Sequence, residues 1–597
     1  MRGPRVMLLA ALGIVVLVLS TAAVAGDRSK GRSDHSPSGH GSPSAERIIR
    51  FEPGTPASEM AKAVEEAGGQ IGEMMAEISA VSVRSDDETF ITSISSNPKV
   101  KALFVDRYFA SGPIDERVSA GGKKHHSSVP SLPSLSFPDP LHDATSANPE
   151  GIIQWDDNRM NVPAAWEKTK GDKSVVVAVL DSGVQGQTRE LDSNYDSKNS
   201  ENGLDCRTIE RELGRGFLRD NGIRDECRDG DRDGHGTWVA SRIGAAANGI
   251  GSNGVSPEVT IRSYKVVAGD FGGLTSWIVS GMVEACHDGA DIVNMSIVGY
   301  DDPAVDTDAQ DYLLWADAVE YCRSQGSLVV AAAGNDHVRV DRRNVTVGGR
   351  SFSGAGQVSS GNDGIGIVYP GETIERGFTD LRGMLLVPGG LPGVAVVSAT
   401  ANAVADAAEA RADVRWPANR VGARDQLAYY SNYGSRVDIA APGGARKYNI
   451  SLFDGGLGDV LADGYGSLAA VDSNTAYCRD SVLSADYNSA CFTIDNQAFA
   501  WSQGTSMAAP NLSGVAALVL ARHSELRKNP SALLSRLQQT ARRSVVNMTG
   551  PNDPDNYAPA MDGTGCSTGF CHLDFGQAIR FGDAYGAGIV DAGAAVS

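Results

Sequence analysis

The stretch Gly504-Thr505-Ser506-Met507-Ala508-Ala509-Pro510 stands directly before an apolar, helix-like run at 511–522. A serine among small residues at the start of a helix lets a substrate backbone come close. The free N–H groups and the positive dipole end of the helix favour an anion there. A plainer interpretation is that Thr505 or Ser506 simply caps the helix. A nucleophilic role for Ser506 therefore requires a base, an orienting acid and an oxyanion donor elsewhere in the chain.

Upstream of this stretch, apolar strand-like runs alternate with helical runs from residue 151 onward. This alternation predicts an α/β fold with a doubly wound, mostly parallel sheet and helices on both faces. Sites in such sheets lie beyond the carboxyl ends of the strands. The expected strands span 174–180, 259–267, 291–297, 328–334, 394–399 and 437–441, and the expected helices span 237–247, 275–288 and 312–325.

Three polar residues fall where this rule places a site. Asp181 ends the first strand, His235 opens a helix, and Asn335 ends a later strand. A histidine can take the serine proton, a carboxylate can fix the imidazole tautomer, and an amide can hold the oxyanion. Taken singly, each is equally well a turn residue or a helix cap. Together with Ser506 they give the chain order Asp, His, Ser, which is one of the known triad orders.

On these residues the chain resembles the subtilisin family of serine peptidases, the subtilases. The resemblance implies that Asp181, His235 and Ser506 form the triad and that Asn335 donates to the oxyanion. It also implies that two segments pair with the substrate backbone by strand addition. Those segments are Ser296-Ile297-Val298 and Ala332-Ala333-Gly334. The motifs that carry the resemblance lie at 178–183, 235–237, 294–296, 332–335, 441–443, 504–510 and 586–592.

The chain departs from the family pattern at several positions. Val298 replaces the usual glycine, which predicts a narrower wall for the pocket that takes the residue before the cut. Trp238 and Ser241 stand where the family often has other residues, and Asn511 stands where it commonly has histidine. The segments 186–229, 337–392, 402–426 and 446–500 look like insertions between core elements, so substrate preference cannot be transferred from relatives.

The N-terminal part divides into four segments. Residues 1–25 carry two arginines, an uncharged apolar run and the ending Ala23-Val24-Ala25, which predicts a signal peptide and a secreted protein, extracellular or periplasmic. The alternative is an uncleaved membrane anchor; after signal removal no membrane attachment is expected. Residues 26–45 and 113–150 are polar linkers.

The pattern of residues 46–112 predicts a small α+β domain. Its expected strands span 47–51, 78–83 and 100–105, and its expected helices span 56–67 and 90–96. This domain resembles the inhibitory propeptide of the family, which would act as an intramolecular inhibitor. Maturation cleavage is then expected in 113–150, and 151–597 would form the catalytic domain.

Charge and cysteine content limit the partners. The net charge of −20 argues against nucleic acid. Eight cysteines in an exported chain favour disulfides, and no C-x-x-C spacing supports a metal–thiolate site. Cys286 and Cys322 lie near the ends of two helices that precede site-bearing strands, so we expect this pair to bridge. The remaining cysteines suggest local pairs: Cys206 with Cys227, Cys478 with Cys491, and Cys566 with Cys571.

The triad requires no cofactor, but a structural calcium ion is compatible with the family resemblance. Asn248-Gly249-Ile250-Gly251 resembles a family ligand loop, and the acidic stretch 229–233 is a second candidate, which is equally well a solvated loop.

The sequence thus predicts a secreted serine endopeptidase that cleaves polypeptides through an acyl-enzyme and is made as an inhibited zymogen. One alternative is a catalytically inactive subtilase-fold scaffold that binds peptides. The other, a sedolisin-type acid peptidase, would need glutamate at His235 and aspartate at Asn335.

Overall fold

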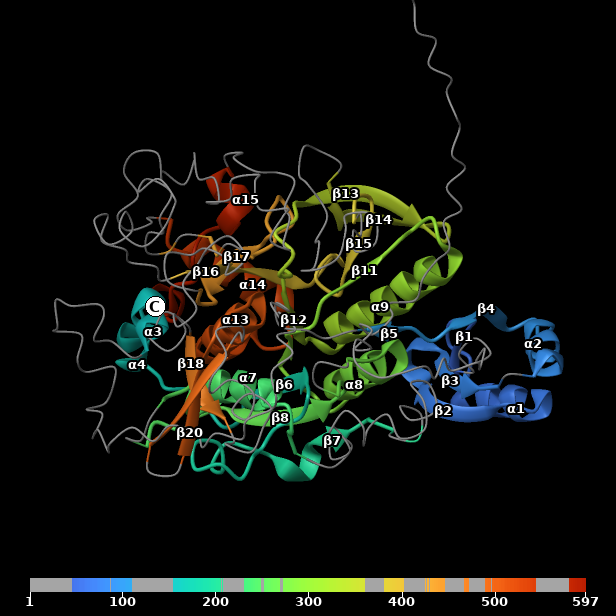
Figure 1. The fold of residues 1–597 in the computed structure, drawn as a ribbon, viewed down its shortest axis with the longest axis horizontal. Helices are drawn as coiled ribbons and strands as arrows, with labels where there is room; N and C mark the ends of the chain where they lie inside the picture. The colour runs from blue at the N-terminus through green and yellow to red at the C-terminus, as the bar shows by residue number, and fades with distance from the viewer. Residues whose placement is uncertain are drawn as a thin grey trace, which may run out of the picture. The chain divides into compact units, whose positions relative to one another are not determined.

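The computed structural model, shown in Figure 1, describes most of the chain between residue 46 and the C-terminus. All described residues belong to one unit, Ser42–Ser597. The expected segments 1–25, 26–45 and 113–150 lie outside the described residues. The described residues are 46–85, 87–109, 154–205, 207, 230–248, 252–268, 272–359, 381–401, 425, 427–428, 430–445, 467–471, 489–494, 497–543 and 579–597.

A seven-stranded sheet forms the centre of the C-terminal part, by which we mean the described residues from 154 onward, with the order β17-β16-β12-β10-β6-β8-β7. Every neighbouring pair in it is parallel. The doubly wound, mostly parallel sheet expected from the sequence is therefore confirmed. The strands are β6 (Val176–Asp181), β7 (Glu201–Asn202), β8 (Thr260–Lys265), β10 (Ile292–Met295), β12 (Leu328–Ala332), β16 (Ala395–Thr400) and β17 (Ile439–Pro442).

Helices cover both faces of this sheet because its strands are apolar on both sides. Within β6, Val177 and Val179 join one buried cluster, whereas Ala178 and Leu180 join another. Helices α7 (His235–Gly244) and α13 (Thr505–Arg522) supply the first cluster, and α8 (Thr275–His287) and α9 (Asp306–Gln325) supply the second. Figure 1 shows α8 and α9 lying side by side.

Helix α13 begins at Thr505, six residues earlier than the expected run at 511–522, so Ser506 lies within its first turn. Pro510 is consequently inside the helix, where it has no N–H to donate to the carbonyl of Ser506. The Ser296 hydroxyl donates to that carbonyl instead, at 2.8 Å. A proline, which usually interrupts helices, is thus tolerated because the side chain of Ser296, directly after β10 (Ile292–Met295), satisfies the orphaned acceptor.

The segment 337–392, treated only as an insertion in the sequence, contributes most of a second sheet. This sheet is antiparallel and has the order β11-β15-β14-β13. Its first strand directly follows Ser296-Ile297-Val298, so the inserted sheet extends one expected substrate-binding edge. The strands are β11 (Gly299–Asp301), β13 (Val340–Val347), β14 (Arg350–Val358) and β15 (Leu385–Val387).

Other elements complete the C-terminal part. A three-stranded sheet has the order β18-β20-β19, and short helices from both ends of the C-terminal part pack together, α4 against α16. The bounds are α3 (Trp155–Arg159), α4 (Val162–Trp166), β18 (Ser467–Val471), β19 (Ser489–Ile494), β20 (Gln497–Ser502), α14 (Pro530–Thr540), α15 (Phe581–Tyr585) and α16 (Ala592–Ala595).

Residues 46–109, which we call the N-terminal subdomain, form an α+β unit with its own core. Its four-stranded sheet has the order β2-β3-β1-β4 and carries two helices. Strand β2 was not expected, because Gln70, Gly72 and Glu73 break any apolar alternation along it. The elements are β1 (Glu46–Phe51), α1 (Ala57–Ala67), β2 (Gln70–Met75), a 3-10 turn (Ala76–Ile78), β3 (Ala80–Arg84), α2 (Glu88–Ser95) and β4 (Val100–Val105).

The end of the N-terminal subdomain contacts helix α8 and the inserted sheet. Strand β5 (Tyr108–Phe109) pairs antiparallel with β9 (Gly273–Leu274). The Arg107 carbonyl accepts from the Thr275 N–H at 2.8 Å, and the Asp106 carboxylate accepts from the Ser276 N–H at 3.1 Å. The Asp106 carboxyl group thus meets the first turn of α8, and burial raises its pKa to about 8 despite the hydrogen bond from Ser276.

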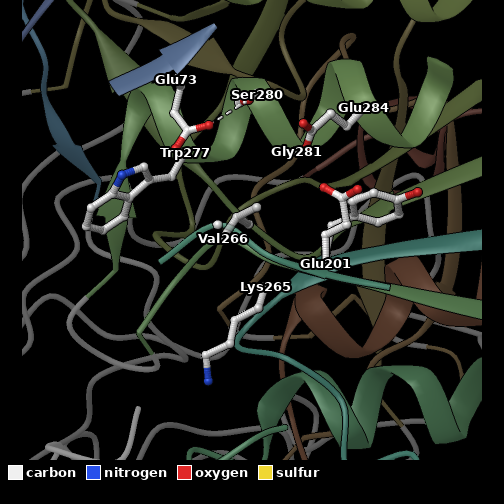
Figure 2. A pocket seen from close by; sticks show the side chains of 10 residues that line it. Glu73, Glu201, Lys265, Val266, Trp277, Ser280, Gly281 and Glu284 are labelled. Atoms are coloured by element: carbon white, nitrogen blue, oxygen red, sulfur yellow. Dashed lines mark hydrogen bonds between the residues drawn. The ribbon is translucent and has the colours of Figure 1, made fainter. Parts of the chain in front are cut away.

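Strand β2 contacts another part of α8 across a small polar cavity. Figure 2 shows Glu73 of β2 pointing toward Ser280, whose hydroxyl donates to its carboxylate at 3.2 Å. Glu201 and Glu284 line the same cavity. Burial raises the pKa of Glu73, despite its hydrogen bond to Ser280.

Cys286 of α8 and Cys322 of α9 form a disulfide with Cα atoms 5.1 Å apart, in agreement with the expected pairing. For the other six cysteines, the expected pairs involve residues or side chains outside the described part of the chain. A search of the described residues finds no helix with the length and apolar character needed to cross a bilayer.

Candidate active site

Asp181 and His235 meet at the carboxyl end of the central sheet. Asp181 is the last residue of β6 and is 1% exposed, and His235 is the first residue of α7 and is 8% exposed. The His235 Nδ1 atom lies 2.8 Å from Asp181 Oδ1. Gly236 permits this approach, because a Cβ atom there would lie 2.1 Å from the Gly183 carbonyl oxygen. The sequence order of strand, turn and helix therefore places a carboxylate against an imidazole.

The described part of the acidic stretch 229–233, a candidate for cation binding, makes hydrogen bonds to helix α7 and to the residue before it. The Asp231 carboxylate accepts from the Gly234 N–H and from both the N–H and the hydroxyl of Thr237, at 2.7–2.8 Å. The Asp233 carboxylate accepts from the His235 N–H at 3.0 Å. Both carboxylates therefore satisfy donors in and before the first turn of α7, where the dipole also favours a negative charge.

These carboxylates also set the charge state of the imidazole. Burial disfavours the imidazolium, but the Asp181 carboxylate, with further help from Asp233 and Asp231, outweighs burial and raises the pKa of His235 to about 9. Burial raises the pKa of Asp233 to about 6. With Nδ1 donating to Asp181, the free electron pair of the neutral ring resides on Nε2, where a base needs it.

Ser506 lies at the same carboxyl end of the sheet, beside Ser296, which directly follows β10. Its side chain is nearly buried, with the residue 5% exposed, and its hydroxyl donates to the Ser296 carbonyl at 3.3 Å. Met295 pairs with Leu180 across β10 and β6, so Ser296, directly after β10, lies level with Asp181, the last residue of β6. The structure therefore brings the Asp181–His235 pair and the Ser506–Ser296 pair to one end of two neighbouring strands.

Asn335 is held by the residue before Ser506. Its Oδ1 atom accepts from both the Thr505 N–H at 2.9 Å and the Thr505 hydroxyl at 2.7 Å. The Thr505 hydroxyl also accepts from the Gly334 N–H at 3.1 Å. Because Oδ1 is held in this way, the donor side of the amide, Nδ2, is the part oriented for another acceptor. Thr505 is a site residue whose role was not recognised from the sequence, although it lies within the quoted motif.

The two expected substrate-binding segments are held in place by different contacts. The Ala333 N–H donates to the Val397 carbonyl at 3.0 Å, which fixes the turn after β12 to β16. Ile297 is buried, whereas Val298 packs against an apolar cluster of the inserted sheet that contains Val338 and Val340. The effect of Val298 on the pocket stays a prediction, but its packing partners come from the insertion.

The positions that depart from the family pattern tie α7 to its neighbours. The Trp238 indole donates to the Ala500 carbonyl at 2.9 Å. The Arg242 guanidinium donates to Asn511 Oδ1 at 2.6 Å and forms a buried ion pair with Asp157. Asn511 therefore accepts from a buried cation, a role that suits an amide better than a protonated histidine.

Among the described residues, no group of three or more histidine, cysteine or carboxylate side chains could hold a metal ion. One buried carboxylate is unusual, however. Both oxygens of Glu190 are buried without a hydrogen-bond partner in the described part of the chain. Burial raises the pKa of Glu190 to about 8, and Arg189 opposes this only in part. Its carbonyl accepts from the Ala246 N–H, two residues before Asn248; residues 249–251 of the expected ligand loop lie outside the described residues.

The fold and the site are those of an α/β serine hydrolase. Comparison with known proteins identifies the family. The subtilase family model matches residues 172–565, more than half of the chain, so the chain belongs to the subtilase family. Its similarity to named proteases of that family makes it a subtilisin-like serine endopeptidase, a peptide hydrolase.

Individual relatives support the same assignment. The epidermin leader peptide-processing serine protease EpiP of Staphylococcus epidermidis is 26% identical over 400 residues, which cover 64% of this chain and 67% of EpiP. An intracellular serine protease of Paenibacillus polymyxa is 30% identical over 278 residues, covering 45% of this chain and 74% of that protein. The crystal structure of EpiP from Staphylococcus aureus shares the fold, with a TM-score of 0.54 and 17% identity over 92% of this chain and 97% of that chain.

Proposed function

We propose that this chain hydrolyses peptide bonds through Asp181, His235 and Ser506, with Asn335 as an oxyanion donor. The observation that carries the proposal is the 2.8 Å contact between His235 Nδ1 and the buried Asp181 carboxylate. This contact selects the tautomer whose Nε2 can accept a proton. The contact lies at the carboxyl edge of the central sheet, where Ser506 also lies. An inactive scaffold would have no reason to retain this arrangement.

Acylation begins when His235 takes the proton of the Ser506 hydroxyl, which then attacks the scissile carbonyl carbon. The hydroxyl leaves its long 3.3 Å contact with the Ser296 carbonyl in this step. Asp181 stabilises the imidazolium that forms, and the imidazolium then protonates the leaving amine. Water replaces the amine, and its oxygen attacks the acyl carbon while His235 takes its proton. The bond to Ser506 Oγ then breaks as His235 returns the proton to that oxygen.

Oxyanion stabilisation would come from two donors beside the nucleophile. Thr505 holds Asn335 Oδ1 at 2.7–2.9 Å, so the amide N–H groups are oriented before substrate arrives. The backbone N–H of Ser506, in the first turn of α13, is the second donor. Preorganised donors of this kind contribute about 10²–10³ each to the rate.

Substrate would bind as an added strand between Ser296-Ile297-Val298 and Ala332-Ala333-Gly334. Backbone pairing fixes the scissile bond independently of side-chain sequence, and pockets then select side chains. EpiP and NisP are named for processing the epidermin and nisin leader peptides. Leader peptides of this kind are therefore the first defined substrates to try beside an unbiased library.

Labelling by a serine-directed fluorophosphonate tests the nucleophile assignment. The matured chain should form one covalent adduct, which peptide mapping places on Ser506, and Ser506→Ala should abolish it. Ser524→Ala, a change at an exposed serine, is the matched control and should label like the wild type. An adduct at another residue, or equal labelling of Ser506→Ala, would contradict the proposal.

The N-terminal subdomain would act as an inhibitory propeptide. Three contacts of its last residues with the C-terminal part support this role. They are the β5–β9 pairing, the Asp106–Ser276 hydrogen bond and the ion pair of Arg107 with buried Asp301. Release would follow cleavage within 113–150. Export, proposed from the signal-like residues 1–25, would precede this cleavage. The N-terminal subdomain would therefore keep the zymogen inhibited until the chain leaves the cell.

A structural calcium ion is proposed on the basis of Glu190. A buried carboxylate with both oxygens unpartnered fits one position in the oxygen shell of a hard cation. Bound calcium would favour the ionised form of Glu190, whose pKa burial raises to about 8, and would fix the segment after α7. The triad chemistry needs no metal, so calcium is expected to affect stability rather than the chemical step.

A further inference from the structure

Asn432 lies beneath the turn that carries Asn335, and its side chain is fully engaged there. The residue is 1% exposed. Its Oδ1 atom accepts from the Asp336 N–H at 3.1 Å and from the Val338 N–H at 3.0 Å. Its Nδ2 atom donates to the Ala333 carbonyl at 2.8 Å and to the Tyr300 hydroxyl at 2.7 Å. These four bonds use the full capacity of a primary amide.

The backbone of Asn432 adds a fifth bond to the same turn. Its N–H donates to the Gly334 carbonyl at 2.9 Å. Gly334 has a φ of 105°, and a Cβ atom there would lie 2.2 Å from Asn432 Nδ2, so the turn fits closely over this amide. The residues held on both sides of Asn335 are therefore Ala333, Gly334, Asp336 and Val338.

Thr505 and Asn432 control different parts of Asn335. Thr505 binds the Asn335 side chain through Oδ1, as described above. Asn432 binds the backbone immediately before and after it. The side-chain direction is thus set by one residue and the backbone position by the other, and a donor needs both to aim at a point where charge develops.

We propose that Asn432 is a positioning residue for the oxyanion donor: it sets the backbone of the 333–338 turn so that Asn335 Nδ2 points at the developing oxyanion. This inference rests on the proposed role of Asn335. Asn432 itself does not touch substrate. Its loss should therefore lower kcat more than it changes KM, and its effect should depend on Asn335 being present.

Tyr300 provides a way to separate positioning from general packing. Its hydroxyl accepts from Asn432 and donates to the Asp336 carboxylate at 2.5 Å, so it joins β11 to the same turn. Tyr300→Phe removes this arm and the hydrogen bond from Tyr300 to the Asp336 carboxylate, but it leaves the Ala333, Asp336 and Val338 bonds of Asn432 in place. It is the matched control, and its kcat should stay within about threefold of the wild type, because the backbone bonds of the turn are retained.

A double-mutant cycle on the matured enzyme tests the proposal. The proteins are the wild type, Asn432→Ala, Asn335→Ala and the double variant, each assayed on one peptide with active enzyme counted by fluorophosphonate titration. Asn432→Ala should lower kcat about 10- to 100-fold in the wild type, with KM within about threefold. In the Asn335→Ala background the same change should lower kcat less than about threefold, because the group it positions is gone.

Equal loss of kcat in both backgrounds, or no loss in the wild type, overturns the positioning role. If Asn335→Ala alone leaves kcat unchanged, the proposed oxyanion role of Asn335 fails, which is a different outcome. Should Asn432→Ala yield no folded protein, Asn432→Ser enters the same cycle with the same criteria, because its hydroxyl keeps one donor and one acceptor.

Discussion

Replacing Asp233 by asparagine should move the acid limb of the pH–rate profile to lower pH. Asp233 accepts from the His235 N–H at 3.0 Å, and asparagine can keep that acceptor while losing the charge. A charge that raises the pKa of His235 holds the imidazole in its protonated, inactive form to higher pH. Removing the charge lowers that pKa, so the neutral base is present at lower pH.

The size of the shift follows from the charges around the imidazole. The pKa of His235 rises from 6.5 to about 9. This rise is the net of two opposing effects: burial lowers the pKa of His235, and three carboxylates, of which Asp181 contributes most, raise it by more. The pKa of Asp233 is about 6, so Asp233 is charged while His235 titrates. Its removal should lower the apparent pKa of the acid limb by about 0.5–1.5 pH units.

The assay is kcat/KM of a fluorogenic peptide between pH 5 and pH 10, which reports the base in the free enzyme. The wild-type limb should lie above the ordinary histidine value of about 6.5. Glu258→Gln, which removes one charge at an exposed position, should leave the limb within about 0.2 pH units, because exposed charges are screened. An unmoved limb in Asp233→Asn, or a limb that moves to higher pH, would refute the electrostatic reasoning.

Three further results are expected. Calcium should raise the melting temperature of the wild type by several degrees, because a ligand of the folded state stabilises it; differential scanning fluorimetry of Glu190→Gln should show little such rise, and an equal rise would remove Glu190 from the calcium site. Arg107→Ala leaves Asp301 buried without this cation, at a cost of about 2–5 kcal/mol. The unprocessed variant chain should therefore show earlier peptidase activity than the exposed control Lys62→Ala, and identical time courses would contradict the inhibitory contact. Peptide mapping without reduction should recover Cys286 linked to Cys322, whereas a free thiol at either position would contradict the bridge.

The sheet, its helices and the placement of the candidate site were predictable because they depend on local pattern. Apolar runs at strand length predicted β6, β8, β10, β12, β16 and β17, and the carboxyl-edge rule then placed Asp181 and Asn335 at one side of the sheet. The contact between Asp181 and His235 follows from the parallel arrangement of the strands and from Gly236, whose lack of a side chain permits close approach.

Features that depend on pairing between distant segments were not predictable. The inserted sheet joins β11 to β15 across more than 80 residues, and no short-range pattern encodes that pairing. Helix α13 begins before Pro510 because Ser296, distant in sequence, satisfies the carbonyl that the proline leaves open. No sequence motif singled out Asn432, and its four side-chain bonds identify it as a support of the 333–338 turn.

The central claim is that this subtilase cleaves peptides through Ser506. The most direct measurement is cleavage profiling on a peptide library with the wild type and Ser506→Ala, both freed of the N-terminal subdomain, with folding of the variant verified by its melting temperature. The account predicts cleavage by the wild type and a loss of at least about 10³-fold in Ser506→Ala. Cleavage that persists at the wild-type rate in Ser506→Ala, or its absence from the correctly folded, matured wild type, would contradict the account.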